Sequence, residues 1–159
     1  MKVAQQLNLP DFGIKCRSTV EGPQLFDPSR RIWVAHTHEE HVRQHFLNYL
    51  VHDRQCPLGL IRTEQELTLN TLSKRADIVV HDDHGRPLAL VECKAPGVRI
   101  DQSTFDQATR YNIIFKVRWL LLTNGLKHYC FVVDHASGEV KSVPLIPLYA
   151  EMMAAVRGA

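Results

Sequence analysis

A chain of 159 residues, 45% apolar and 23% charged, is typical of one globular domain with a substantial core. The formal net charge of +2 is too small to indicate a uniformly basic nucleic-acid-binding protein, although it permits a local basic patch. No apolar stretch approaches the ~20 residues that cross a bilayer, and the N-terminus lacks the apolar core of a signal peptide, so we expect a cytoplasmic protein with no membrane partner.

Cysteine and histidine spacing gives no zinc signature. The four cysteines are scattered without a Cys-x-x-Cys pair, which predicts free and mostly buried thiols. His41 and His45 have the spacing of a helical metal pair, but no His-Glu-x-x-His motif accompanies them. Packing or surface roles are therefore the favoured interpretation of these histidines.

The first part of the chain is rich in proline and glycine and has no clear periodicity. We interpret residues 1–24 as an irregular N-terminal arm, followed by short strands near residues 24–26 and 31–35. No repeat, low-complexity segment or linker follows, so residues 1–159 are predicted to form a single domain.

A helix is predicted from His38 to about His52, because Thr37 followed by Glu40 resembles a capping box. At ~100° per residue, Glu39 falls near the middle of the apolar stripe with Arg43 beside it, and Glu40 lies well to one side. A buried carboxylate is unusual, so Glu39 is a candidate site residue and Glu40 the capping partner. Favourable placement of Glu39 near the helix N-terminus is the competing explanation.

A strand over residues 59–69 precedes a predicted hairpin with strands near 75–81 and 87–94. Asp77 and Glu92 are equally distant from a turn centred between His84 and Gly85, so the two carboxylates are expected to face each other across the strands. Lys94 is two residues beyond Glu92 and should point to the same face.

Converging Asp and Glu oxygens suit Mg²⁺ or Mn²⁺, and Lys94 would orient or activate an attacking water. The competing explanation is an ordinary cross-strand ion pair on a solvated face. Against it, the neighbouring residues on both strands are apolar on both faces, as in central strands covered on two sides. Charges placed there are costly without a metal or a functional partner.

The rest of the chain predicts a helix from Asp101 or Ser103 to about Phe115, strands at 119–123, 128–134 and 140–143, and a last helix at 146–156. A mixed sheet flanked by helices makes the fold α/β or α+β. Gln107 and Tyr111 share a face of the helix that follows Lys94, and could face the cleft or the substrate; packing for Tyr111 and a surface role for Gln107 are the alternatives. Arg43 and Arg75 are further candidates for contact with substrate.

Four ordered motifs together resemble the PD-(D/E)xK nuclease superfamily, and more narrowly the N-terminal nuclease domain of type I restriction enzyme R subunits. They are Glu39-Glu40-x-Val-Arg-Gln-x-Phe, Lys74-Arg-Ala-Asp77-Ile-Val-Val, Val91-Glu92-Cys-Lys94-Ala-Pro and Phe105-Asp-Gln107-x-x-Arg-Tyr111-Asn. Ala76 stands where the superfamily's name has proline.

The resemblance implies a restriction-endonuclease-like central sheet in which Asp77 and Glu92 bind Mg²⁺ and Lys94 supports the attacking water. Glu39, with Glu40 as the alternative, would complete the acidic set. Gln107 and Tyr111 match a glutamine-tyrosine motif of this branch.

The expected function is Mg²⁺-dependent (or Mn²⁺-dependent) hydrolysis of DNA phosphodiesters. The chain has no Gly-x-x-x-x-Gly-Lys-Ser/Thr phosphate loop, so a separate motor or specificity protein is an expected partner, and a homodimer is a further option. Two alternatives are a non-catalytic module that binds nucleic acid or protein on a nuclease scaffold, and a domain whose ion pairs are only structural.

Overall fold

The computed structural model describes residues 5–157, apart from the side chains of Leu67, Leu69, Leu72, Tyr111, Ile113 and Arg157. A small antiparallel sheet comes first and consists of β1 (Cys16–Thr19), β2 (Gly22–Asp27) and β3 (Ile32–Ala35). The predicted arm is therefore not irregular to residue 24, because β1 pairs with β2 from Cys16↔Leu25 to Thr19↔Gly22.

The large sheet has six strands in the order β4-β5-β6-β7-β8-β9. Its strands are β4 (Ile61–Leu69), β5 (Leu72–His81), β6 (Pro87–Cys93), β7 (Trp119–Thr123), β8 (His128–Val133) and β9 (Val140–Val143). The β6–β7 pair is parallel and the other pairs are antiparallel. The sheet is therefore mixed, which confirms the predicted fold class.

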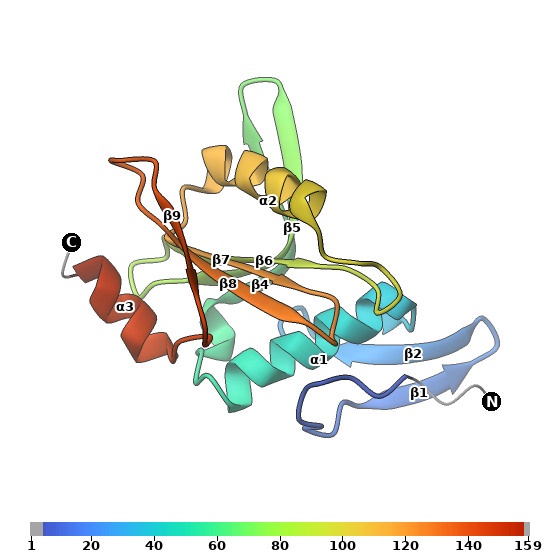
Figure 1. Ribbon diagram of the computed structural model, residues 1–159. Helices are drawn as coiled ribbons and strands as arrows, with labels where there is room; N and C mark the ends of the chain where they lie inside the picture. The colour runs from blue at the N-terminus through green and yellow to red at the C-terminus, as the bar shows by residue number, and fades with distance from the viewer. Residues whose placement is uncertain (1–4, 158–159) are drawn as a thin grey trace.

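Helices cover both faces of this sheet (Figure 1). Helix α1 (His38–His52) lies on one face and α2 (Gln102–Phe115) on the other, while α3 (Tyr149–Arg157) follows β9 and a short 3₁₀ helix (Leu58–Leu60) precedes β4. Each face has its own apolar core. The core on the α1 face includes Phe46, Leu50, Ile78, Val80 and Val91. The core on the α2 face includes Val79, Leu90, Ala108, Leu120 and Leu122. The hairpin strands are thus covered on both sides, as predicted.

The hairpin of β5 and β6 has the predicted register. Its paired residues are Ile78↔Val91, Val79↔Leu90 and Val80↔Ala89, and a shift follows at His81 next to the turn. Asp82 closes the turn, because its carboxylate accepts from the backbone N–H groups of His84 and Arg86.

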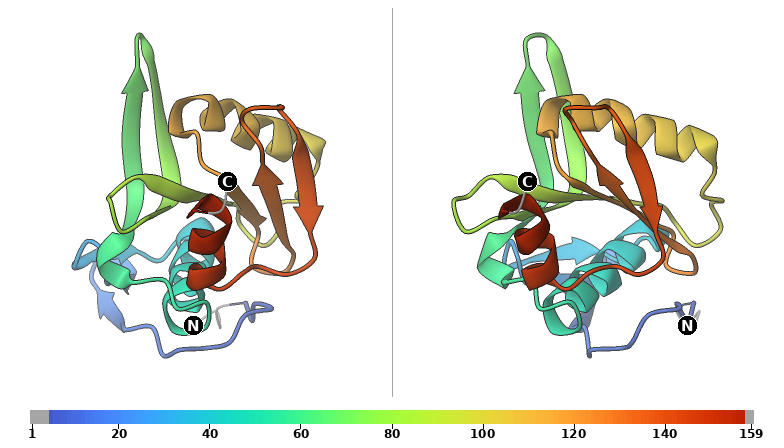
Figure 2. Two further views of the ribbon diagram at one scale, coloured as in Figure 1. Left: turned by 90° about the vertical axis from the view of Figure 1, so that its left-hand side faces the viewer. Right: turned by 60° about the vertical axis from the view of Figure 1, so that its left-hand side comes forward.

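Strand β5 starts at Leu72, earlier than predicted, since β4 and β5 remain paired as far as Leu69↔Leu72. The outer part of this β4–β5 hairpin projects beyond the sheet in both views of Figure 2. Three of the four cysteines are buried and all are free, which confirms that prediction. Over residues 5–157, no helix has both the length and the apolar character needed to cross a membrane.

The N-terminal arm is attached to the core near the β7–β8 turn. Leu7 is buried in the core on the α1 face, and the N–H of Asn8 donates to the carbonyl of Gly125 at 2.8 Å. Gly125 has φ +82°, and a Cβ there would lie 2.7 Å from Leu7 Cδ2 and 3.1 Å from Val42 Cγ2. The close approach of arm, helix and turn therefore requires glycine.

We expect Gly125→Ala to lower the free energy of unfolding by about 2 kcal/mol, combining left-handed backbone strain with overpacking. Gly138→Ala is the matched control, because Gly138 also has positive φ (+75°) but nothing within 4 Å of an added Cβ. The control should lose only about 1 kcal/mol. Urea unfolding of both variants measures the difference, and equal losses would show that the arm does not pack as described.

Candidate functional site

Three carboxylates occupy one row across the first three strands of the large sheet. The pairs Thr63↔Ile78 and Gln65↔Ala76 place Glu64 of β4 opposite Asp77 of β5. Continuing the β5–β6 register by one residue beyond Ile78↔Val91 places Asp77 opposite Glu92. Sequence reasoning found the last two residues and missed Glu64, which looked like one of several polar residues alternating along β4.

Strands β5 and β6 separate where this row lies. Their pairing ends at Ile78↔Val91, although both strands continue. Beyond that point the backbone N–H of Cys93 donates to Asp77 Oδ2 at 2.8 Å. A side-chain carboxylate has therefore replaced a backbone carbonyl, and the orientation of Asp77 is fixed within the gap between the strands.

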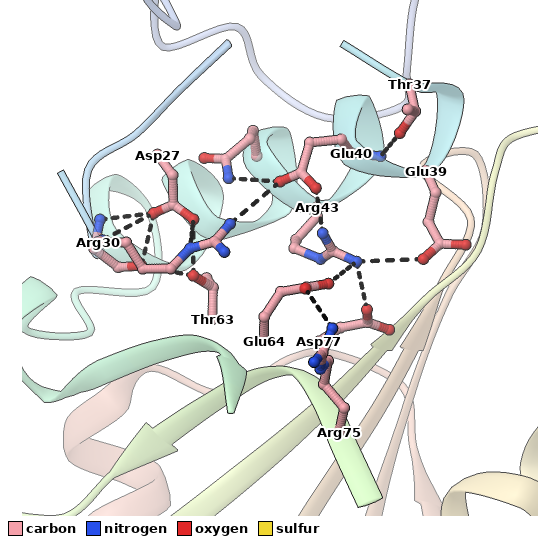
Figure 3. Close-up of polar contacts among 12 residues, drawn as sticks. Asp27, Arg30, Thr37, Glu39, Glu40, Arg43, Thr63, Glu64, Arg75 and Asp77 are labelled. Carbon is pink, nitrogen blue, oxygen red and sulfur yellow. Dashed lines mark hydrogen bonds and ion pairs between the residues drawn. The ribbon is translucent and has the colours of Figure 1, made fainter. Parts of the chain in front are cut away.

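Arg43 of α1 lies at the centre of the acidic cluster (Figure 3). Its Nη2 is 2.8 Å from Asp77 Oδ1, 3.0 Å from Glu64 Oε1 and 3.3 Å from Glu39 Oε1, and its Nη1 donates to Glu40 Oε2. The side chain is only 6% exposed. Arg43 was predicted to contact substrate, but in this arrangement its guanidinium faces carboxylates and is not open to a DNA phosphate.

Burial by itself would lower the pKa of Arg43, but the carboxylates of Asp77 and Glu40 raise it above its ordinary value. The guanidinium is therefore a permanent positive charge in the fold. Removing it would leave buried carboxylates facing each other without a cation.

Glu40, rather than Glu39, is the buried glutamate of α1. Glu40 is 8% exposed and its carboxylate accepts from Arg43 and from Gln44 Nε2, whereas the Glu39 side chain is 48% exposed at the rim. The predicted burial of Glu39 is therefore wrong. The reason is that Glu40, Arg43 and Gln44 form a polar part of the inward face, which apolar periodicity does not count.

The helix cap is confirmed in part. Thr37 Oγ1 accepts from the backbone N–H of Glu40 at 3.0 Å, as an N-cap should. The Glu40 side chain, however, binds Arg43 and Gln44 instead of completing the capping box.

Partial burial and the negative charge of Asp77 raise the pKa of Glu39, while Arg43 and Lys94 oppose the rise. The pKa of Glu39, at the rim, therefore depends on both Asp77 and Lys94.

Glu92 is the least satisfied carboxylate of the cluster. It is 6% exposed, its Oε1 lies 3.6 Å from Lys94 Nζ, and its buried Oε2 has no hydrogen-bond partner. Burial raises the pKa of Glu92 to about 8, and repulsion from Asp77 adds to this, although Lys94 opposes it. The contact between Glu92 and Lys94 agrees with the expectation that both side chains share a face.

The carboxylates of the cluster can be compared with the ligands that a divalent cation requires. Within residues 5–157, no three His, Cys, Asp or Glu side chains are arranged to hold a metal ion, so Glu39, Asp77 and Glu92 do not form the predicted three-residue set. Asp77 and Glu92 still fit a hard cation, because the unpartnered Glu92 Oε2 and a second lone pair on each Asp77 oxygen remain available. Mg²⁺ commonly binds through one or two carboxylates plus water and substrate phosphate.

Three other residues predicted to contact substrate lie on β5 and α2. Arg75 is exposed on β5, with its Nη1 3.4 Å from Glu64 Oε2. Gln107 is half-buried on α2, and Tyr111 belongs to α2 but its side chain lies outside the described residues. Their roles toward substrate stay predictions.

A second polar cluster, unforeseen from the sequence, supports the first (Figure 3). Asp27 of β2 is fully buried and accepts from Thr63 Oγ1 at 2.7 Å, from Ser29 and from Arg30. The second cluster joins the small sheet to β4 one residue before Glu64. Hydrogen bonds from Ser29, Thr63 and Arg30 lower the pKa of Asp27 despite the opposing effect of burial.

The histidines of α1 pack against the N-terminal arm. His41 Nε2 is 3.0 Å from the carbonyl oxygen of Gln5, and His41 Nδ1 is 3.0 Å from His36 Nε2. The rings of His41 and His45 meet edge to face with centroids 4.5 Å apart. The packing role predicted for the His41 and His45 pair is therefore confirmed.

Comparison with known proteins gives a family match and matches to solved structures. Residues 38–147 match the family described as the type I restriction enzyme R protein N terminus. A fragment structure of a protein described as an HsdR subunit of a type I restriction enzyme from Vibrio vulnificus is 23% identical, with a TM-score of 0.39, and the match covers 63% of this chain. The match covers 19% of that chain, so this chain spans only a small part of its length. The curated proteins gave no match.

The raised pKa of Glu92 predicts a pH dependence of stability. The folded state favours protonated Glu92, so the free energy of unfolding should fall as pH rises from the ordinary value of 4.5 towards about 8. Glu92→Gln removes the titration and should flatten this part of the profile. Urea unfolding in EDTA across this range measures it, with exposed Glu139→Gln as control. A Glu92→Gln profile as steep as the wild type's would contradict the assignment.

Replacing Arg43 tests the cation at the centre of the cluster. Arg43→Met should lower the free energy of unfolding by about 3 kcal/mol, because Asp77 and Glu40 would remain buried without their partner. Arg75→Met is the control, since Arg75 is 62% exposed and forms a surface ion pair with Glu64, and it should cost under about 1 kcal/mol. Chemical denaturation compares the two, and similar losses would show that Arg43 is no more important than a surface charge.

Proposed function

The chain belongs to the type I restriction enzyme R protein N terminus family, and from this premise we propose that it hydrolyses phosphodiester bonds of DNA with the help of Mg²⁺ or Mn²⁺. The observation that supports the proposal most is the buried and unpartnered Oε2 of Glu92 beside Asp77, with Lys94 next to it. A buried carboxylate oxygen without a partner is unfavourable unless a ligand satisfies it.

The balance of charge at the cluster favours a divalent cation. Five carboxylates (Glu39, Glu40, Glu64, Asp77 and Glu92) lie around four cationic side chains, with Arg43 and Lys94 inside the cluster and Arg30 and Arg75 at its edge. With every group ionised, this excess of negative charge repels a DNA phosphate and attracts Mg²⁺ or Mn²⁺. Asp77 and Glu92 would hold the ion, and it would polarise the phosphate and lower the pKa of a bound water.

The other side chains of the site have separate proposed roles. The Cys93 N–H and Arg43 hold the Asp77 carboxylate in one orientation, so no reorganisation is needed when substrate arrives. Lys94 is partly exposed and would place a positive charge against the negative charge that develops on the phosphate, or orient the attacking water. Glu39 at the rim would accept a hydrogen bond from that water.

DNA is the proposed partner, and proteins that move or select DNA are proposed as further partners. Residues 1–159 contain no phosphate-loop motif for ATP, so translocation would depend on a motor outside these residues. Arg75 and Gln107 are proposed to contact the DNA backbone from β5 and α2, on either side of the acidic row.

A second candidate function is a binding module without catalysis. It is favoured by the position of Arg43, which occupies the centre of the acids, and by the lack of a three-residue metal set among residues 5–157. This candidate predicts salt-dependent DNA binding with no cleavage when Mg²⁺ or Mn²⁺ is added.

Cleavage of plasmid and linear DNA tests the proposed function. Wild-type protein with Mg²⁺ or Mn²⁺ should cut, and Asp77→Asn and Lys94→Met should each lower the rate by roughly 100-fold or more. Lys141→Met is the control for loss of one positive charge, because Lys141 is exposed on β9. Cutting by Asp77→Asn at the wild-type rate would contradict the proposal.

A further inference from the structure

An aromatic pocket lies beside the start of α2, on the same face of the large sheet as α2. It has a volume of about 260 Å³ and is lined by Phe105, Tyr129 and Phe131, together with Ile100, Leu122, Gln102 and the acidic Asp101. The rings of Phe105 and Phe131 meet edge to face with centroids 4.9 Å apart. Tyr129 is 37% exposed, so part of a third ring is open to solvent.

The register of the sheet places this aromatic pocket in line with Glu92 of the acidic row. Glu92 is the partner of Leu122, and Leu122 is the partner of Tyr129. Partners in adjacent strands carry their side chains on the same face, and strands are about 4.8 Å apart, so Glu92 and Tyr129 are separated by about 10 Å along the row. This corresponds to about three stacked base steps of a DNA strand at 3.4 Å per step.

The chemistry of the lining suits a planar ring with polar edges. Aromatic side chains stack on bases of any sequence, with a contribution of about 1–3 kcal/mol per base. Gln102 lies at the rim, and the Tyr129 side chain ends in a hydroxyl, so both offer hydrogen-bonding groups to the edge of a base. An aliphatic side chain of a protein partner would pack on the rings but would make no hydrogen bond with these polar groups.

The loop from β6 to α2 supplies positive charge between the two sites. It begins with Lys94 and contains Arg99, which is exposed and has no ion-pair partner among residues 5–157. A strand that runs from the acidic row to the aromatic pocket would pass this loop, and its phosphates would meet these cations. The charges therefore complement a nucleic-acid strand along this path.

We propose that the aromatic pocket binds an unpaired nucleobase of the DNA strand whose phosphate lies at Asp77 and Glu92. The inference rests on the proposed nuclease function, and it adds a substrate class: DNA with a single-stranded or unwound segment near the cut. A duplex would have to release one base to fill the pocket, so the pocket favours single-stranded over fully paired DNA.

Fluorescence of a single-stranded oligonucleotide that carries 2-aminopurine tests the proposal in a chain with Asp77→Asn, where no cutting interferes. Binding should quench the base, and Tyr129→Leu, which removes the ring but keeps an apolar side chain, should weaken binding about 10-fold, as expected for one stacking contact. Phe12→Leu is the control, because Phe12 is an exposed aromatic residue outside the pocket. Circular dichroism checks that both variants are folded, and half-buried Phe131→Leu provides a second variant of the pocket.

The outcomes separate the two proposals. The parent is the chain with Asp77→Asn. The pocket assignment would be overturned if the parent and its Tyr129→Leu and Phe131→Leu variants showed equal affinity and quenching. Failure of the parent chain to bind the single strand, or binding of a fully paired duplex as tightly as the single strand, would also overturn it. If the parent binds and quenches the base but the wild type cuts no DNA with Mg²⁺ or Mn²⁺, the pocket stands and the nuclease function fails.

Discussion

Arg43 places a permanent positive charge between α1 and the first strands of the large sheet, where carboxylates of both accept hydrogen bonds from it. Glu40 comes from its own helix, while Glu64 and Asp77 come from β4 and β5. Carboxylates this close and this buried would repel one another strongly without a cation. The guanidinium therefore allows this end of the sheet to lie close to α1, and it gives Asp77 a fixed orientation.

The same arrangement leaves one carboxylate, Glu92, that does not contact Arg43. Glu92 is on the far side of the gap that opens after Ile78↔Val91, and it contacts Lys94 rather than Arg43. Its unpartnered oxygen and the spare lone pairs of Asp77 point to an ion that supplements Arg43 without replacing it. Arg43, which stabilises the fold, and the metal ion proposed for catalysis would thus lie on different sides of Asp77.

Much of the fold and about half of this site followed from the sequence. Strand alternation and the symmetric turn were enough to place Asp77, Glu92 and Lys94, because hairpin register depends on local geometry. Burial was assigned to Glu39 and not to Glu40, and Arg43 was not expected to pair with the carboxylates, because the apolar stripe takes no account of the polar part of the inward face that Glu40, Arg43 and Gln44 form. Glu64 was missed for a different reason: its position depends on how β4 pairs with β5, and its backbone adopts φ +53°, which is uncommon for glutamate.

Calorimetric titration of the metal-free protein with Mn²⁺ near pH 7 tests the central claim, that Asp77 and Glu92 bind one ion beside Arg43. With the pKa of Glu92 at about 8, a large share of this carboxyl group is protonated at that pH, and the ion must displace the proton. The account predicts binding of one ion with proton release, measured from the dependence of the heat on the buffer. It also predicts no proton release and much weaker binding in Glu92→Gln. Absence of binding, or equal affinity in wild type and Glu92→Gln, would contradict it.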